Sequence, residues 1–321
     1  MMKSWKNLKI NNKKMKTTFF SYGALLVFMT ALLSCEKVIE PKSLPQQDSR
    51  LVVNALFYGN STVYINVSAS KSIVSNKAVK YIDNAICALY DNGVFVENLL
   101  NYKGGNYTGK TQIKEEHRYE LTVSAPGYTT VSASTQIPSA FSYTNLTRYD
   151  TIDSGFNLSD FAGKTNLNCS IKMRGTVIDD SQVKNHYLVQ PFIVAFGPYN
   201  QQLPISFKPY ISSIGSTNGG YSLDLDDTKP VNGNQIPFDV VINHYQEIDT
   251  TDLRSLKLYL YFYSMSDEYY KYRTAISKQQ TTGVSLFSEP VLDYSNVTNG
   301  MGIMAGASQS FVFVYEKRIK K

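Results

Sequence analysis

Residues Leu256–Tyr263 have the sequence LKLYLYFY, in which aliphatic or phenylalanine side chains alternate with lysine and tyrosine. Successive side chains of an extended strand point to opposite faces of a sheet. One face of this stretch therefore carries leucine and phenylalanine, and the other carries Lys257, Tyr259, Tyr261 and Tyr263. This period of two predicts a β-strand that buries its leucine face in a hydrophobic core.

The row formed by Tyr259, Tyr261 and Tyr263 is the candidate partner-binding site. Tyrosine rings offer amphipathic contact area to a protein partner and stack on sugars. The alternative is that a helix covers the row, because a sheet packed against a helix buries such faces. Ser266-Asp267-Glu268 follows the strand and is typical of a helix start, and Tyr269–Gln279 is the one segment that clearly predicts a helix.

Short strand patterns separated by turn residues fill residues 49–138. Asp91-Asn92-Gly93 lies between the strand-like stretches Ile86–Tyr90 and Val94–Val96. It predicts a hairpin, because Asn and Gly accept the positive φ angles that such a turn requires. A second turn is expected at Ala125–Tyr128. This spacing of strands and turns predicts an antiparallel sandwich of immunoglobulin-like type.

The fold class predicted for the chain is mainly β. Composition and strand patterns divide the chain into five segments. In order, these are a lipoprotein signal peptide, a flexible tether, an immunoglobulin-like β-sandwich, a linker and a second antiparallel β domain with one short helix. Their ranges are 1–34, 35–48, 49–138, 139–165 and 166–321. The tether is assigned from its proline and glutamine, and the linker from its serine, threonine, asparagine and glycine.

The basic excess of the chain belongs to its leader. The 321 residues include 32 Lys and Arg against 26 Asp and Glu, a net charge of +6. Six of the 32 basic residues, and no acidic one, precede Cys35, which leaves 26 basic groups against 26 acidic ones in the rest. A charge-balanced chain argues against binding to nucleic acid, which depends on cationic surfaces.

The leader has the pattern of a lipoprotein signal. The basic segment Lys13–Lys16 precedes the apolar run Phe19–Leu33, which is shorter than the ~20 residues of a membrane-spanning helix. The run leads into Leu32-Leu33-Ser34-Cys35, which resembles a bacterial lipobox. We therefore predict that Cys35 is acylated and anchors the mature chain to a membrane. The alternative is an ordinary signal peptide followed by a chance cysteine.

No motif of the sequence predicts catalysis or a metal site. His117, His186 and His244 are far apart and have no histidine or cysteine at metal-ligand spacing. We interpret His186 and His244, each followed by a tyrosine, as strand-surface residues. Asp224–Asp227 lacks the glycine and glutamate of a calcium loop and is interpreted as a solvated strand end. The covalent lipid on Cys35 is therefore the only non-protein group that we expect.

Two further cysteines, Cys87 and Cys169, lie in the mature chain. A secreted chain permits a disulfide between them. Cys87 stands within an apolar alternation, however, and free cysteine is readily buried in a core. We therefore expect two thiols that do not pair with each other.

Several segments, taken in order, resemble a lipoprotein family of the Bacteroidota, the domain of unknown function 4249. They are Ser34–Ile39, Leu51–Leu56, Ala85–Gly93, Tyr119–Tyr128, Asn185–Tyr187, Ser266–Tyr270, Phe287–Val291, Asn296–Val297 and Gly300–Ile303. Acidic residues directly after Cys35 also resemble the surface-export signal of such lipoproteins. The resemblance implies accessory partners of TonB-dependent outer-membrane transporters and supplies no catalytic residue.

The function expected from these observations is that of a non-enzymatic lipoprotein of the outer membrane, facing the cell exterior. Its acyl chains would hold it beside a β-barrel protein such as a TonB-dependent transporter, as an accessory or binding subunit. Two alternatives stay open: a surface hydrolase, in which one of the three histidines meets a carboxylate and a nucleophile, and a structural or adhesive surface protein.

Replacement of Cys35 tests the anchor. We expect Cys35→Ser to abolish metabolic labelling of the chain with palmitate and to move the protein from the membrane pellet to the soluble fraction. Cys87→Ser is the matched control and should keep both properties. A Cys35→Ser chain that still carries the label would contradict the prediction.

Overall fold

The computed structural model describes residues 48–71, 77–140, 142–149, 155–161, 164–178, 186–214, 219–225, 235–282 and 294–319. All of them belong to one compact unit, Asp48–Lys321. The predicted signal peptide, Cys35 and the tether up to Gln47 lie outside the described residues, as do Asp226 and Asp227.

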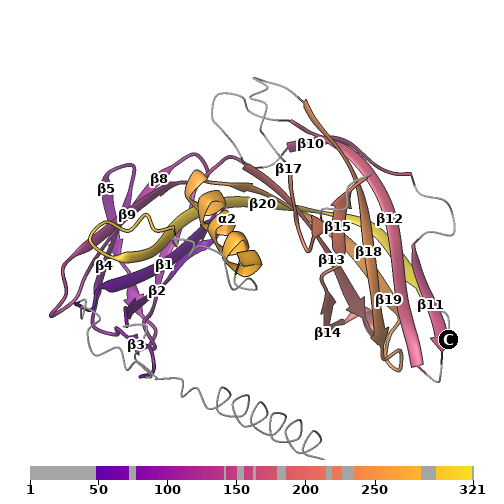
Figure 1. Cartoon of the computed structure of the whole chain (residues 1–321), viewed down its shortest axis with the longest axis horizontal. Helices are drawn as coiled ribbons and strands as arrows, with labels where there is room; N and C mark the ends of the chain where they lie inside the picture. Colours follow the sequence, from indigo (N-terminus) through magenta and orange to yellow (C-terminus); the bar gives the residue numbers. More distant parts are fainter. Residues whose placement is uncertain are drawn as a thin grey trace, which may run out of the picture. The chain divides into compact units, whose positions relative to one another are not determined.

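Three sheets make up the described fold (Figure 1). The ten-stranded sheet contains β1 (Leu51–Tyr58), β2 (Thr62–Ala69), β3 (Lys80–Tyr81), β6 (Leu100–Asn101), β7 (Asn106–Gln112), β13 (His186–Phe196), β14 (Gln202–Phe207), β17 (Leu223–Leu225), β19 (Ser255–Met265) and β20 (Met301–Arg318). The six-stranded sheet contains β10 (Ser142–Arg148), β11 (Phe156–Phe161), β12 (Lys164–Ile178), β15 (Tyr210–Ser213), β16 (Gly219–Gly220) and β18 (Gln235–Ile248). The four-stranded sheet contains β4 (Ile86–Asp91), β5 (Val94–Asn98), β8 (Arg118–Ser124) and β9 (Val131–Gln136).

The predicted mainly β fold is confirmed. Both expected hairpins form, β4 with β5 and β8 with β9. Asn92 and Gly93 adopt φ angles of 49° and 81° in the first turn, as the Asn-Gly sequence predicts, and Gly127 adopts 80° in the second. Elements with this alternation require a second sheet to cover their apolar faces, and the structure contains two such cores.

The first core lies between the four-stranded sheet and strands β1, β2 and β7. Val53 and Ile65 contribute side chains from one sheet, and Leu89 and Leu121 contribute side chains from the other. All four side chains are at most 1% exposed, so the apolar faces of these strands are buried against one another. A sandwich was expected for residues 49–138, and the structure differs in that Val297 and Met304, near the end of the chain, also belong to this core.

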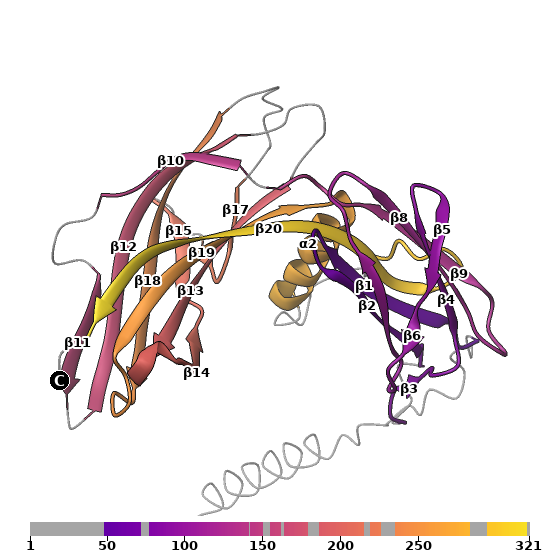
Figure 2. The same cartoon turned by 180° about the vertical axis from the view of Figure 1, so that it is seen from behind.

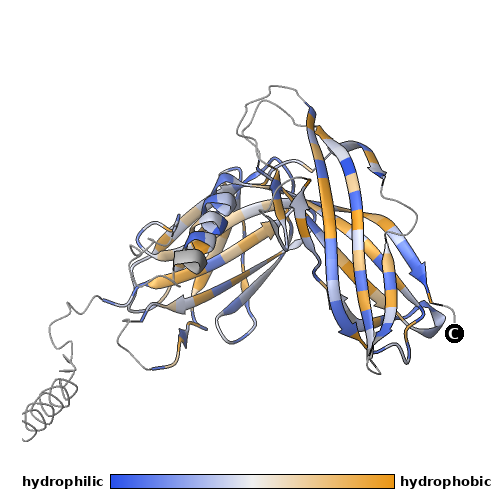
Figure 3. Cartoon of the chain, turned by 45° about the vertical axis from the view of Figure 1, so that its right-hand side comes forward, coloured by the Kyte–Doolittle hydropathy of each residue, from blue (hydrophilic) through white to orange (hydrophobic). Residues whose placement is uncertain are grey.

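The second core lies between strands β13 and β19 and the six-stranded sheet. Leu256, Leu258, Leu260 and Phe262 are fully buried in it, as the alternation of Leu256–Tyr263 predicts. Figure 3 shows hydrophobic and hydrophilic residues alternating along the strands at the front of this half of the fold. The core therefore occupies one face of β19 and leaves its tyrosine face outside.

Strand β20 belongs to both halves of the fold. Residues Val52–Tyr58 of β1 pair with Met301–Ala307 in parallel, and β19 pairs with Ala307–Arg318 in antiparallel. Figures 1 and 2 show β20 as one long strand beside β1 at one end and β19 at the other. The local sequence pattern predicts a closing strand only at Phe311–Tyr315. It carries no signal for the parallel pair, because the partners are about 250 residues apart along the chain and only non-local pairing joins them.

Asn296 fixes the start of β20. Its amide oxygen accepts a hydrogen bond from the Met304 backbone N–H at 2.9 Å, and its amide nitrogen donates to the Met304 carbonyl at 2.7 Å. The same nitrogen lies 3.3 Å from the Ser134 carbonyl of β9. One side chain thus satisfies backbone groups of two sheets, which such groups require when they are buried.

The segment 139–165, which we expected to be a linker, contains two strands. β10 and β11 pair with opposite ends of β12. Phe156 is 1% exposed in the second core, and Tyr143 stacks on Phe262 at a ring separation of 4.9 Å. Its many serine, threonine and asparagine residues suggested a loop, but a few apolar residues at alternate positions are enough for a half-buried strand.

Helix α2 (Asp267–Thr282) is the predicted helix. The Ser266 hydroxyl accepts a hydrogen bond from the Tyr269 backbone N–H at 3.3 Å, which makes Ser266 the N-cap. Asp267 and Glu268 lie in the first turn, where carboxylates oppose the positive end of the helix dipole. Glu268 also accepts a hydrogen bond from Thr135 of β9 at 3.0 Å, which ties the helix to the first sandwich. Within the described residues, no helix is both long and apolar enough to cross a membrane.

Gly302 is the position where the parallel pair demands glycine. Its φ is +106°, and a Cβ atom there would lie 2.1 Å from the Val53 carbonyl oxygen. We expect Gly302→Ala to lower the free energy of unfolding by ~2 kcal/mol or more, measured by urea denaturation. Gly93→Ala, whose φ is also positive but whose Cβ meets nothing within 4 Å, is the control. It should cost only ~1 kcal/mol of φ strain. Equal costs would contradict the close approach.

Candidate functional site

The tyrosine row lies on the outer face of the ten-stranded sheet. Tyr259, Tyr261 and Tyr263 are each partly buried, between the fully buried residues of the other face. In register, Tyr259 stands opposite Phe313 of β20 and Phe192 of β13, and Tyr261 stands opposite Phe311. The row is therefore continued sideways across three strands by phenylalanine.

Tyr269 of helix α2 lies close to Tyr263, at one end of this row. Burial raises the pKa of Tyr263 to about 12, with a further contribution from Tyr269 of the helix. Burial also raises the pKa of Tyr58 on β1, and hydrogen bonding to Tyr269 adds to this shift. Tyr269 of the helix is thus a neighbour of Tyr263, whereas Tyr259 and Tyr261 have phenylalanine neighbours.

Five side chains, which we call the aromatic face, form the other end: Phe192, Tyr259, Tyr261, Phe311 and Phe313. Tyr261 stacks on Phe311 at 5.4 Å between ring centroids and meets the edge of Phe192 at 5.0 Å. Tyr259 meets Phe313 at 5.9 Å. These are the separations at which aromatic pairs attract each other beyond simple burial. The rings therefore hold one another in a continuous layer.

The aromatic face is exposed at its β20 side. Phe311 is 61% exposed and Phe313 is 52% exposed. Lysines border the layer: Lys208 lies 5.7 Å from the Phe192 ring centroid, and Lys257 lies 4.2 Å from that of Phe196. Exposed aromatic rings that form a continuous layer are typical of a surface that binds another protein, where aromatic residues are enriched.

His186 is buried, which differs from the strand-surface position expected for it. It is 6% exposed and stacks on Tyr270 of α2 at 3.8 Å between ring centroids. Its Nε2 lies 3.3 Å from an Asp267 carboxylate oxygen, and that carboxylate also pairs with Lys271. The hydrogen bond from Lys271, and then that from His186, holds the pKa of Asp267 below its usual range. The cluster joins β13 to the first turn of the helix.

The other two histidines lie on different segments, His117 directly before β8 and His244 on β18. His117 Nδ1 is 2.7 Å from an Asp91 carboxylate oxygen beside the first hairpin, with one third of its side chain exposed. His244 of β18 packs against Phe207 at 5.0 Å between ring centroids, and its buried Nε2 has no hydrogen-bond partner among the residues that the structure describes. Burial therefore lowers the pKa of His244.

The described part of the chain holds no cluster of three or more His, Cys, Asp and Glu side chains suited to a metal ion. Asp224, from the predicted solvated strand end, forms an ion pair with Arg273 of α2 at 2.8 Å. Cys87 is buried in the first core and Cys169 in the second. Burial raises the pKa of the Cys87 thiol to about 12, which makes it an unreactive core residue.

The tyrosines of the aromatic face were predictable from the alternation of Leu256–Tyr263, but its phenylalanines lie on other strands. Phe311 and Phe313 alternate with Val312 and Val314, so a signal for an outward aromatic row was present. What the sequence could not provide was the pairing register, which places this row beside Tyr259 and Tyr261.

Fold and site together define a mainly β protein with an exposed aromatic surface on the outside of a sheet. The chain belongs to the family described as a domain of unknown function, DUF4249, whose sequence model matches residues 36–311. No curated protein and no solved structure shows a significant similarity to it.

The buried imidazole of His244 predicts a pH effect on stability. Burial favours its neutral form in the folded chain, so the unfolded chain binds the proton more readily below the usual histidine pKa of ~6.5. The free energy of unfolding should therefore fall more in the wild type than in His244→Gln between about pH 7.5 and about pH 5.5. Urea denaturation at the two pH values measures both differences, and an equal fall in the two proteins would contradict the prediction.

Proposed function

We propose that the chain is a non-enzymatic, lipid-anchored binding subunit of the bacterial outer membrane, whose aromatic face contacts a β-barrel protein. The observation that carries the proposal is the exposure of Phe311 and Phe313 beside Tyr259 and Tyr261. Rings of this kind, when buried at an interface, account for much of its binding energy.

The rest of the proposal depends on the leader. The lipobox-like Leu32–Cys35 supports an anchor on the mature chain, and the resemblance to lipoproteins of the Bacteroidota supports an outer-membrane, outward-facing location. A protein held by acyl chains is confined to the membrane surface, so a moderate affinity between neighbours is sufficient for association. A TonB-dependent transporter is the barrel that the resemblance favours.

The geometry gives the aromatic face a binding role more readily than a catalytic one. Its members are phenylalanine, which has no titratable group, and tyrosine, whose hydroxyl has an ordinary pKa of ~10 and is protonated at neutral pH. Contact area and ring stacking are then what the surface offers to a partner. The charge balance of the mature chain fits this proposal, since shape and aromatic contact do not require net charge.

Affinity purification from detergent-solubilised membranes tests this function. A wild-type chain tagged after Lys321 should recover one outer-membrane barrel protein, identified by mass spectrometry. Phe311→Asp should reduce that recovery ~10-fold, because a buried unpaired carboxylate costs more than the lost ring contact alone. Circular dichroism of both proteins shows whether the fold is retained.

Tyr245→Asp is the matched control, since Tyr245 is an exposed aromatic residue, at 72%, on β18 of the other sheet. It should recover as much of the barrel as the wild type does. Recovery of no barrel by the wild type would contradict the proposal and favour a structural or adhesive surface protein.

A further inference from the structure

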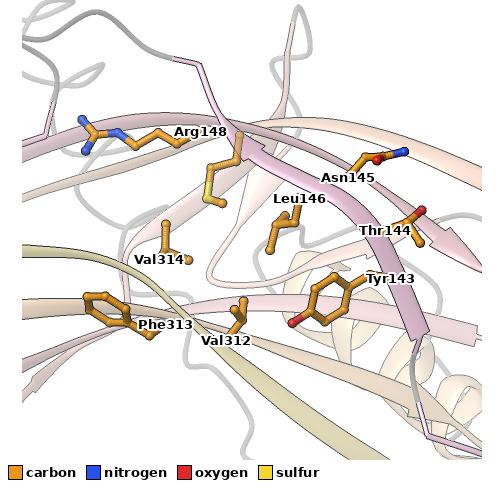
Figure 4. Close-up of a pocket in the computed structure, with 9 residues that line it drawn as sticks. Tyr143, Thr144, Asn145, Leu146, Arg148, Val312, Phe313 and Val314 are labelled. Atoms are coloured by element: carbon orange, nitrogen blue, oxygen red, sulfur yellow. The ribbon is translucent and has the colours of Figure 1, made fainter.

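Two of the pockets beside the second core differ in their chemistry. One, of about 300 Å³, lies between β10 and β20, and Figure 4 shows Leu146, Val312 and Val314 pointing toward one another in it. These side chains pack against the second core, so this pocket continues the apolar interior. The other, of about 660 Å³, lies beside β15 and β18 and has a lining of another kind.

Rings and hydrogen-bonding groups line this other pocket, which we call the β18 pocket. Three of its rings are the exposed tyrosines Tyr210, Tyr221 and Tyr245, whose exposed fractions are 40%, 65% and 72%. Its polar side chains are Ser206, Lys208, Asn243 and Gln246. Among the described residues that line it, none is an aliphatic leucine, isoleucine or valine. The pocket therefore offers ring faces and polar groups rather than an aliphatic surface.

The register of the six-stranded sheet brings the tyrosines together. Tyr210 of β15 stands opposite Asn243 of β18. Its neighbour Ile211 is buried in the second core, so Tyr210 faces away from that core. Tyr245 follows Asn243 by two residues and lies on the same outer face of β18. Tyr221 directly follows β16, which pairs with β15 beside Tyr210.

Gly219 of β16 makes room for the ring of Tyr210. A Cβ atom at Gly219 would lie 2.7 Å from Cε1 of that ring, which is shorter than the ~3.5 Å at which carbon atoms come into contact. The ring therefore lies close to the backbone of β16. A ring positioned in this way loses little freedom when a ligand binds, which favours affinity.

Two side-chain amides of the pocket are available to a ligand. Asn243 and Gln246 are both exposed, and within the described part of the chain neither side chain is hydrogen-bonded to another residue. An amide presents donors and an acceptor together, which matches a hydroxyl group that both donates and accepts. The one charged side chain among the described lining residues is Lys208, which lies 5.7 Å from the Phe192 ring centroid.

We propose that the β18 pocket binds an uncharged oligosaccharide, with sugar rings against Tyr210 and Tyr245 and hydroxyl groups bonded to Asn243 and Gln246. A sugar ring has faces of C–H groups that pack on aromatic rings, and its edge carries hydroxyls that suit amides. A phosphate-rich ligand such as a nucleic acid requires a cationic surface, which a single lysine does not provide. The volume of about 660 Å³ lies within the ~300–1,000 Å³ of small-molecule sites.

This inference goes beyond the proposed function, because it requires neither the aromatic face nor a barrel. Lys208 is the residue that borders both sites. Phe311→Asp, which should lose the barrel, is therefore expected to bind the sugar as the wild type does. The two sites can thus fail independently of each other.

An oligosaccharide array followed by titration calorimetry tests the proposal. The full chain is purified in a detergent without a sugar headgroup and applied to an array of neutral oligosaccharides, acidic oligosaccharides and peptides. The neutral sugar with the strongest signal is then titrated. We expect Tyr245→Ala to raise its Kd ~10-fold or more, because the stacking ring is lost. Tyr245→Phe keeps the ring and should stay within ~3-fold of the wild type.

Tyr102→Ala is the matched control, since Tyr102 is a tyrosine of the first half of the chain that is 77% exposed, and it should leave the Kd unchanged. Asn243→Ala should raise the Kd ~5-fold or more through its lost hydrogen bonds. The proposal would be overturned by a Kd that Tyr245→Ala does not change, by an equal loss in Tyr245→Phe, or by binding only to acidic sugars or to peptides. Binding to nothing on the array would overturn it as well.

Discussion

The pairing of β20 with β1 on one side and with β19 further along is the constraint on which the rest of the structure depends. Seven residues of β20 complete the sheet that covers the first core, and the remainder completes the sheet that covers the second. The sheet is continuous through this strand. Gly302 and Asn296 make the junction possible, the first by allowing close approach to Val53 and the second by satisfying Met304.

The aromatic face follows from the same strand. Val312 faces the second core, and Phe311 and Phe313 on the alternate side join the tyrosines of β19 in the aromatic face. Past Ala307, β1 no longer pairs with β20, and within the described residues β19 alone does. One strand therefore completes the sheet over both cores and supplies the exposed side of the aromatic face.

Local signals in the sequence were sufficient for most individual elements. The alternation of Leu256–Tyr263 predicts the buried face of β19, Asn92-Gly93 predicts a hairpin, and Ser266 predicts the start of α2. These features depend on contacts between residues near one another along the chain.

Long-range features were not predictable in the same way. The parallel β1–β20 pair, the strands within 139–165 and the phenylalanines beside Tyr261 depend on register between distant segments. A single sequence carries no direct signal for such pairing, because many registers satisfy the same alternation. The burial of His186 was not predictable from the sequence either, because it results from packing against Tyr270 of α2, a residue distant along the chain.

If β20 joins the two cores into one cooperative unit, both cores should unfold together. Cys87 reports on the first core and Cys169 on the second. The most direct measurement is the rate of thiol labelling at each cysteine across a urea series, in the chain without Cys35. The account predicts the same unfolding free energy, within ~0.5 kcal/mol, from both cysteines. Two clearly separate transitions, one for each cysteine, would contradict it.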